Sequence, residues 1–242
     1  MNNSLVNSVD NIKANLSFVS QQIEQLVLQA QRPQDSVRLL AVSKTKPISA
    51  LQAAYDAGQR AFGENYVQEA VEKYHALCDL KDIEWHFIGP IQSNKSRQIA
   101  ETMDWVHTID REKIARRLSE QRPEHMPPLN VCIQVNISDE PSKSGISLDQ
   151  LTSMVELIQG LPRLCLRGVM AIPASQQTHI DQCAVYRPLV DAFSALSKRD
   201  ERLDTVSIGM SGDMAAAIES GSSMVRVGTA IFGERDYRPS EG

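Results

Sequence analysis

The sequence lacks the features that mark several large classes of protein. Its four cysteines form no CxxC pair and no metal-ligand spacing, and no stretch approaches the ~18 apolar residues of a membrane span. The N-terminus has no basic segment followed by an apolar one, so we expect no secretory signal. The net charge of -5 argues against a general nucleic-acid binder, which would carry a basic stripe. These absences favour a cytoplasmic protein that binds neither membranes nor nucleic acids.

Short apolar runs alternate with longer amphipathic stretches along most of the 242 residues. The apolar runs predict eight strands, at Val37–Val42, Arg60–Gly63, Trp85–Ile88, Trp105–Thr108, Leu129–Val135, Leu164–Ala171, Thr205–Ile208 and Met224–Val227. The amphipathic stretches predict helices at Ile48–Ala57, Val67–Leu77, Ser93–Glu101, Arg111–Glu120, Leu148–Ile158, Ile180–Lys198 and Met214–Ser220. An extra helix over about residues 9–30 precedes the first strand. Each of the seven predicted helices after this one follows the strand of the same number.

Eightfold βα alternation predicts a (β/α)8, TIM-like barrel, with a doubly wound open sheet as the alternative. Nearly continuous apolar strands are typical of a parallel sheet that is covered on both faces. The hydrophobic content of 42% is enough for one sizeable core. No internal repeat or long interior linker divides the chain, so we expect one domain over residues 1–242, with the barrel at about 37–235.

Polar side chains follow the predicted strands at the points where they end. Lys44, Asn65, His86, His107 and Asn136 all occupy such places. Because the carboxyl ends of barrel strands meet at one mouth, these groups should lie near one another. The clustering predicts a ligand site at that mouth.

Lys44 closes the apolar run RLLAVSK. Strand alternation puts it on the face of Leu40 and Val42, so its amine points into the barrel if they do. A partly desolvated amine has a lowered pKa and can attack an aldehyde. An equally open interpretation is an outward lysine that meets solvent or pairs with a carboxylate such as Glu64.

Two glycine-containing turns predict a phosphate site. The segment SIGMSGDMAAAIESG reads as strand, turn and helix, with Ser211 as the helix N-cap and Gly212 beside it. The eighth strand ends at Gly228 and Thr229. Amides at a helix start, two hydroxyls and close backbone approach suit a phosphate dianion. Barrel phosphate sites often follow strands seven and eight, although an ordinary capped helix gives the same local pattern.

Arg226 interrupts the last apolar strand, on the same face as Gly228. A buried guanidinium must be paired, because an uncompensated charge costs several kcal/mol. Its partner is either a barrel carboxylate or the ring nitrogen of a pyridine cofactor. In the second case the ring nitrogen stays unprotonated, because arginine cannot readily accept a proton.

These residues belong to longer motifs: AVSKTKP at 41–47, FGENYVQE at 62–69, WHFIGPIQSNK at 85–95, SKSGI at 142–146, GMSGDMAAAI at 209–218 and VRVGTAIFG at 225–233. With these motifs the chain resembles the pyridoxal phosphate homeostasis protein (YggS/PROSC) family, fold type III proteins related to the alanine racemase barrel. The resemblance implies that Lys44 forms a Schiff base with pyridoxal 5'-phosphate (PLP). It also implies phosphate contacts from Ser211, Gly228 and Thr229, and Arg226 facing the ring nitrogen. Asn65 and His86 are then expected in the ring pocket, and Met210, Gly212 and Asn136 near the cofactor.

The resemblance favours a carrier and regulator that buffers PLP and delivers it to apo-enzymes, without substantial catalysis. A racemase needs two acid/base groups on opposite faces of the substrate carbon, and we find no second β-rich domain or mouth tyrosine to supply one. A Schiff-base aldolase acting on a phosphorylated sugar is a further alternative, and it would be colourless. We expect a monomer or weak dimer. Lys46 should face solvent, whereas Lys143 is a candidate for a transient second PLP site.

Overall fold

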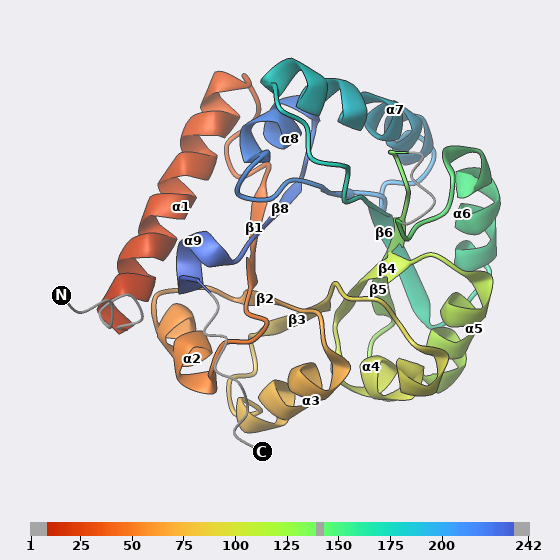
Figure 1. Cartoon of the computed structure of the whole chain (residues 1–242). Coiled ribbons are helices and arrows are strands. Elements are labelled where there is room, and N and C mark those ends of the chain that lie inside the picture. Colours follow the sequence, from red (N-terminus) through yellow and green to blue (C-terminus); the bar gives the residue numbers. More distant parts are fainter. Residues whose placement is uncertain (1–8, 139–142, 235–242) are drawn as a thin grey trace.

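Eight parallel strands close into a barrel in the order β1-β2-β3-β4-β5-β6-β7-β8, which confirms the predicted (β/α)8 fold (Figure 1). The computed structural model describes residues 9–138 and 143–234. The strands are β1 Arg38–Val42, β2 Ala61–Glu64, β3 Glu84–Phe87, β4 Trp105–Ile109, β5 Leu129–Gln134, β6 Leu164–Met170, β7 Thr205–Ser207 and β8 Met224–Val227. Each predicted strand is present, and no strand end differs from its prediction by more than one residue.

Helices ring the barrel on its outside (Figure 1). They are α1 Val9–Gln29, α2 Ile48–Asp56, α3 Val67–Ala76, α4 Ser96–Thr102, α5 Glu112–Gln121, α6 Leu151–Gln159, α7 His179–Ser197, α8 Met214–Ser220 and α9 Thr229–Phe232. Short 3-10 turns, η1 Ser93–Lys95 and η2 Leu148–Gln150, lead into α4 and α6. The one-turn helix α9 has no counterpart among the predicted elements. The N-cap residue of α5 is Arg111, whose side chain makes no capping hydrogen bond.

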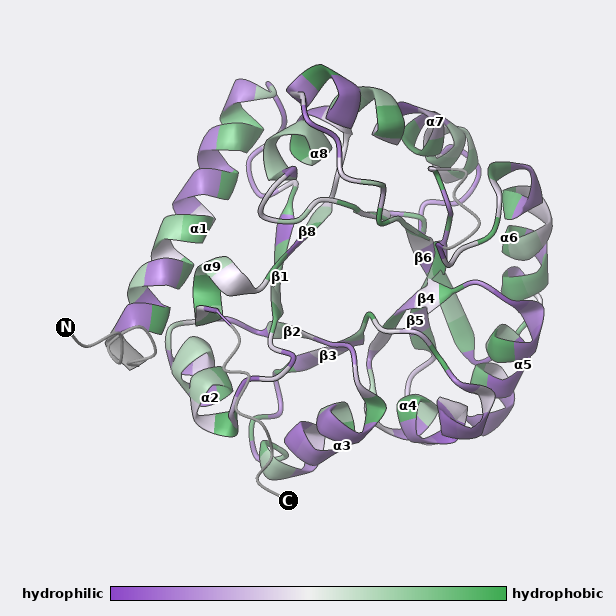
Figure 2. Ribbon diagram, in the orientation of Figure 1, coloured by the Kyte–Doolittle hydropathy of each residue, from purple (hydrophilic) through white to green (hydrophobic). Residues whose placement is uncertain are grey.

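The apolar core lies mainly between the strands and the helices. Figure 2 shows that the surrounding helices carry both hydrophobic and hydrophilic positions, as expected for elements with one covered face. Inside the barrel the apolar groups are few. One small cluster contains Leu40, Ala61, Ile88 and Met224, with Val42 packed against it. A second small cluster contains Trp105, Cys132 and Met170, and polar side chains occupy other positions inside the barrel.

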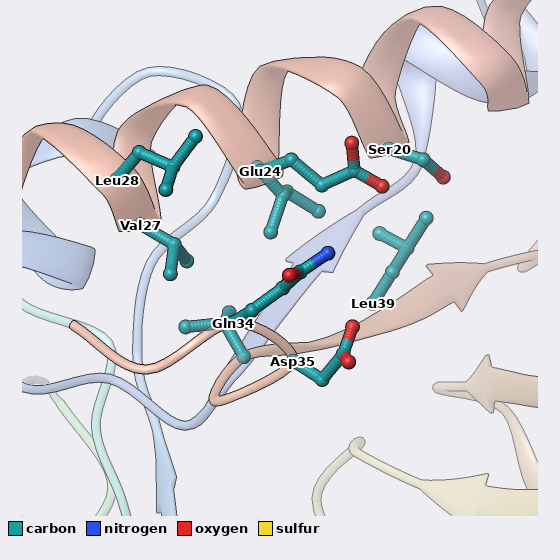
Figure 3. A pocket seen from close by; sticks show the side chains of 9 residues that line it. Ser20, Glu24, Val27, Leu28, Gln34, Asp35 and Leu39 are labelled. Atoms are coloured by element: carbon teal, nitrogen blue, oxygen red, sulfur yellow. The ribbon is translucent and has the colours of Figure 1, made fainter.

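Helix α1 lies outside β1 and contacts α2, α8 and α9 (Figure 1). A cavity of about 300 Å³ separates α1 from the start of β1. Figure 3 shows Glu24, Gln34 and Asp35 around it beside aliphatic side chains, at the end of the barrel where β1 begins. None of the helices within residues 9–138 and 143–234 is long and apolar enough to cross a bilayer.

Candidate functional site

The turn that carries Lys44 begins directly after β1. Lys44 is half-buried, and the next residue, Thr45, has a φ of 63°. A positive φ is unfavourable for a β-branched residue, so the surrounding contacts must hold this turn in place. The predicted shared face of Leu40 and Val42 is confirmed, and Lys44 lies in the turn just beyond the end of that strand.

A buried ionic cluster, which we call the Lys73 clamp, holds that turn. Lys73 Nζ donates to the Ser43 carbonyl oxygen, Glu64 Oε1 and Glu69 Oε1, each at 2.7 Å. Ser43 Oγ also donates to Glu64 Oε1 at 2.5 Å. The backbone amide of Thr45 donates to Glu69 Oε1 at 2.5 Å. The two neighbours of Lys44, Ser43 and Thr45, are thus hydrogen-bonded to side chains from β2 and α3.

The clamp is buried, which makes it sensitive to the loss of any partner. The Lys73 and Glu64 side chains are 4% and 0% exposed. Burial raises the pKa of Glu64 above its usual range, although the Lys73 ammonium and its hydrogen bonds act in the opposite direction. Of the two lysines near Glu64, Lys73 forms the ion pair that the sequence suggested for Lys44.

A cavity of about 250 Å³ opens at the carboxyl ends of the strands. Its lining comes from the segments after β2 to β6: Asn65, Ile88, Pro90, Thr108, Asp110, Gln134, Lys143, Ser144 and Ile172. Asn65 Oδ1 is buried there and has no hydrogen-bond partner in the described part of the chain. An orphaned buried acceptor costs about 1–3 kcal/mol unless a bound molecule satisfies it. Asn65 therefore indicates a place for a donor from a ligand.

The turn after β7 places Met210, Ser211 and Gly212 at the surface. We expected Ser211 to be the N-cap of α8, but Asp213 is the N-cap residue, and the helix begins at Met214 as predicted. Asp213 accepts from the Met210 amide at 2.6 Å and from the Tyr186 hydroxyl at 2.7 Å. These two bonds use the Asp213 carboxylate to fix the turn, and they leave the Ser211 hydroxyl at the surface.

Gly228 lies beside the Lys44 turn because β8 pairs with β1. The register sets Leu40 opposite Arg226, and Gly228 follows β8 at the level of Val42. A Cβ on Gly228 would stand 3.0 Å from the Val42 carbonyl oxygen, so only glycine lets the two chains approach this closely. Thr229 comes next and is exposed at the start of α9.

Arg226 lies inside the barrel, 4% exposed, and its partners are all neutral. Nη1 donates to the Ser207 carbonyl oxygen at 2.5 Å and to Ser207 Oγ at 2.9 Å. Nη2 donates to the Ala171 carbonyl oxygen at 2.9 Å. No carboxylate among the described residues is within ion-pair distance. Three bonds use three of the five N–H groups of the guanidinium, which leaves two donors for a ligand.

A chain of side chains, the interior histidine chain, leads from Arg226 through the barrel to Glu84. Ser207 Oγ lies 2.9 Å from His107 Nδ1, and His107 Nε2 lies 2.9 Å from His86 Nδ1. His86 Nε2 is 3.7 Å from Glu84 Oε2, which is beyond hydrogen-bond distance but within the range of an ion pair. The side chains of both histidines are fully buried.

The donors fix the direction of this chain. Arginine can only donate, so Ser207 Oγ accepts a hydrogen bond from Arg226. The Ser207 hydroxyl in turn donates a hydrogen bond to His107 Nδ1. His107 then carries its proton on Nε2 and donates to His86 Nδ1. Burial lowers the pKa of His86 and places that of His107 well below its usual range, so both rings are neutral at neutral pH. Every donor in the chain thus points away from Arg226.

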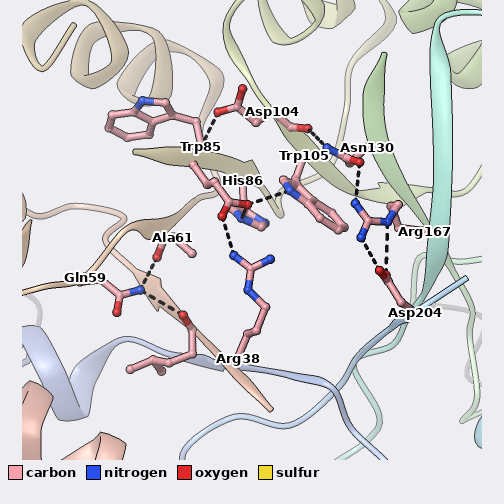
Figure 4. A network of polar contacts seen from close by, with 12 residues as sticks. Arg38, Gln59, Ala61, Trp85, His86, Asp104, Trp105, Asn130, Arg167 and Asp204 are labelled. Atoms are coloured by element: carbon pink, nitrogen blue, oxygen red, sulfur yellow. Dashed lines mark hydrogen bonds and ion pairs between the residues drawn. The ribbon is translucent and has the colours of Figure 1, made fainter. Parts of the chain in front are cut away.

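The other end of the barrel is closed by ion pairs (Figure 4). Glu84 pairs with Arg38 at 2.6 Å and accepts from Trp105 Nε1 at 3.1 Å. Its pKa falls to about 2 through its contact with His86 and through Arg38. Trp105 stacks on His86, with ring centroids 5.2 Å apart. A negative charge therefore terminates the interior histidine chain at the end opposite Arg226.

The remaining candidates occupy different surroundings. Asn136 belongs to the loop after β5, where its amide donates to the Lys143 carbonyl oxygen at 3.3 Å and accepts from the Ser138 amide. His86 is fully buried inside the barrel, where His107 and Ser207 link it to Arg226. We expected Lys46 to face solvent. It is half-buried, and its Nζ donates to the Glu234 carbonyl oxygen. Tyr237 lies outside the described residues.

Several residues of the site were not selected from the sequence. The Lys73 clamp escaped notice because a lysine on an amphipathic helix looks solvent-exposed. Ser207 and Asp213 are short polar residues at ordinary strand and turn positions. The detectable signal was a pair of motifs, FGENYVQE and AVSKTKP, in which Glu69 and Ser43 had no assigned role.

The chain is similar to known proteins over nearly its whole length. The family model for the alanine racemase N-terminal domain matches residues 8–236. A pyridoxal phosphate homeostasis protein of Vibrio cholerae is 56% identical over 229 residues, with 93% of this chain and 97% of that protein covered. Its counterpart in Escherichia coli K12 is 54% identical over 231 residues, with 95% and 99% covered.

Solved structures are also similar to this chain. The PLP-bound structure of PipY from Synechococcus elongatus has a TM-score of 0.79 at 33% identity, covering 92% of this chain and all of that one. Alanine racemase from Corynebacterium glutamicum has a TM-score of 0.67 at 16% identity, covering 97% of this chain and 63% of that one. The second likeness concerns the fold alone.

Proposed function

This chain belongs to the pyridoxal phosphate homeostasis protein family, and on that premise we propose that it binds PLP at the barrel mouth, attached to Lys44. The cofactor supplies an aldehyde, which a primary amine can attack. The pairing of β1 with β8 carries the proposal, because it sets the Lys44 turn beside Gly228 and above Arg226. The chain would thereby take part in intracellular PLP homeostasis.

The residues of the mouth fit such a molecule. The turn at 210–212 and the Gly228–Thr229 step offer backbone amides and two hydroxyls for a phosphate. The absence of a side chain on Gly228 keeps the backbone accessible. Asn65 Oδ1 offers a buried acceptor for the ring, and in this proposal Asn136 and Met210 lie farther from it.

Arg226 faces the ring nitrogen in this proposal. Two of its N–H groups remain for that contact, whereas the other three are held by Ser207 and Ala171. Its role is to donate a hydrogen bond and keep the nitrogen unprotonated, because arginine does not give up its proton. His86 and His107 act at one remove by holding Ser207, and through it Arg226, in position.

The proposed role is storage and delivery of PLP to apo-enzymes, and not turnover of amino acids. Racemisation needs a second acid/base group across the substrate from the lysine. Tyr186 cannot serve, because burial raises the pKa of its hydroxyl, which is bound to Asp213. Tyr55 lies on α2 and is bound to Asp82. An assay with alanine, serine and glutamate that gave robust turnover, lost in Lys44→Ala, would overturn the non-catalytic role.

Titration with PLP tests the binding site directly. The wild-type chain should develop an absorption band above ~400 nm with one equivalent of PLP. Lys44→Ala should lose the band while its circular dichroism remains unchanged. Lys46→Ala is the matched control, two residues away, and should keep the band. A band that survives in Lys44→Ala would contradict attachment at this lysine.

A transfer assay tests delivery. The PLP-loaded chain is mixed with an apo-enzyme and a trap for free PLP, and the activity of the enzyme is followed over time. Direct delivery predicts reactivation that the trap does not prevent. Reactivation that the trap abolishes would mean that PLP is released into solution first, and would limit the role to buffering.

A further inference from the structure

A second group of reactive side chains lies on the outside of the barrel, between α7 and α8. His179 and Cys183 are four residues apart on α7, so they project from the same face of the helix. Glu219 comes from the last turn of α8. One ligand atom of each residue lies within 4.8 Å of the other two. A ring nitrogen, a thiol and a carboxylate thus meet at one point.

The geometry centres on His179 Nε2. Glu219 Oε2 lies 2.7 Å from it, and Cys183 Sγ lies 3.6 Å from it. Tetrahedral zinc with usual Zn–N and Zn–S bond lengths separates the two ligand atoms by about 3.6 Å. The nitrogen and the sulfur therefore already have the required spacing. The carboxylate must retreat by about 0.6 Å to reach ligand spacing, which its long and 61% exposed side chain permits.

We propose that His179, Cys183 and Glu219 form a binding site for Zn²⁺ that pins α7 to α8. An imidazole and a thiolate are ligands that favour zinc over the hard cations magnesium and calcium. The thiolate and the carboxylate balance the double positive charge. The fourth position faces a cavity of about 500 Å³, lined by His179, Glu219, Ala215 and the end of α1, and is open to water.

A simple surface ion pair between His179 and Glu219 is the competing interpretation. Such a pair needs no sulfur and contributes about 0–1 kcal/mol when it is exposed. It does not account for the approach of Cys183 to the same nitrogen that meets Glu219. The site also connects α7 to α8, the helix that follows the turn at 210–212. Zinc bound here would stabilise that packing without touching PLP.

Titration with Co²⁺, a spectroscopic substitute for zinc, tests the site in the metal-stripped, PLP-loaded chain. One equivalent should produce ligand-field bands and a thiolate charge-transfer band, and Zn²⁺ should displace it whereas millimolar Mg²⁺ should not. Cys183→Ser should abolish the charge-transfer band. Glu219→Gln and His179→Gln should each weaken Co²⁺ binding by about tenfold or more, because a three-ligand site tolerates no loss.

Cys78→Ser, at an exposed cysteine elsewhere, is the matched control and should leave binding unchanged. Zn²⁺ should raise the melting temperature of the wild-type chain but not that of Cys183→Ser, and without metal the two should melt alike. Absence of a charge-transfer band, or a band that persists in Cys183→Ser, would mean an ion pair only and overturn the proposal. A band lost in Cys78→Ser would overturn it equally.

Discussion

The two sides of the barrel mouth are held by opposite kinds of interaction. The Lys44 turn rests on charges, because the buried Lys73 ammonium binds two carboxylates and the Ser43 carbonyl. Arg226 rests on neutral groups, because its partners are two carbonyls and a hydroxyl, followed by two neutral histidines. The first arrangement fixes a strained backbone, and the second leaves a charged side chain without a carboxylate partner among the described residues.

This difference follows from what each side must do. A turn with a positive φ at Thr45 stays in place only if several strong contacts converge on it. A guanidinium that is to face a ring nitrogen must not be captured by a nearby carboxylate. The interior histidine chain meets this need by placing its only carboxylate, Glu84, at the far end of the barrel.

The largest effect should come from breaking the Lys73 clamp. Lys73→Ala leaves Glu64 buried without its partner, and we expect a loss of about 3–5 kcal/mol in the free energy of unfolding. Urea denaturation measures it, with the exposed Lys81→Ala as control. A loss below about 1 kcal/mol would show that the clamp does not hold the turn.

Removing the positive charge of Arg226 should act mainly on the binding of PLP. Arg226→Ala deletes a hydrogen bond from a charged donor, worth about 1.5–3 kcal/mol, so the affinity for PLP should fall by about tenfold to a hundredfold. Equilibrium titration measures the dissociation constant, and the exposed Arg202→Ala serves as control. Unchanged retention of PLP would identify Arg226 as a purely structural residue.

The interior histidine chain offers an intermediate test. His107→Phe removes the ring that bonds Ser207 Oγ and His86 Nδ1, which should cost about 1–3 kcal/mol of stability. Because Ser207 then loses its orientation, PLP affinity should fall by a few-fold, less than in Arg226→Ala. His125→Phe, at an exposed position, is the control. Full PLP affinity in a destabilised His107→Phe variant would confine the chain to a packing role.

A pH dependence of stability also distinguishes the two sides, because only the Arg226 side contains buried histidines among the residues that the structure describes. Burial lowers the pKa of His86 and His107, so below about pH 6.5 the unfolded chain binds protons that the folded chain excludes. Stability is therefore full above that pH and declines as the pH falls, by up to about 1.4 kcal/mol per pH unit for each histidine. His107→Phe should reduce this slope. A wild-type stability that is flat between pH 6.5 and 5 would contradict buried neutral histidines.

The fold was predictable because its signals are local. Each strand is a short apolar run such as Leu129–Gln134, and each following helix has apolar residues at helical spacing. The one-turn helix α9 was missed because four residues after Gly228 show no periodicity. The start of α8 at Met214 was predicted correctly, but its N-cap was placed at Ser211, since the sequence does not reveal that Asp213 is engaged by the Met210 amide and Tyr186.

The site divides in the same way. Lys44, Gly228 and Arg226 stand out because each interrupts or ends an apolar strand. The partners that position them come from other strands and helices: Lys73 on α3, Ser207 on β7 and His107 on β4. Which polar residues meet inside a barrel depends on the register of all its strands. His107 and Ser207 are 100 residues apart, and the sequence does not show that they are hydrogen-bonded.

Borohydride reduction of the PLP-loaded chain, followed by peptide mass analysis, tests the central claim most directly. Reduction makes the lysine linkage permanent, so the modified residue can be identified after digestion. The account predicts one modified residue, Lys44, at about one equivalent per chain, with Lys46, Lys73 and Lys143 unmodified at that ratio. Modification centred on any of those three lysines, or none at all, would contradict it.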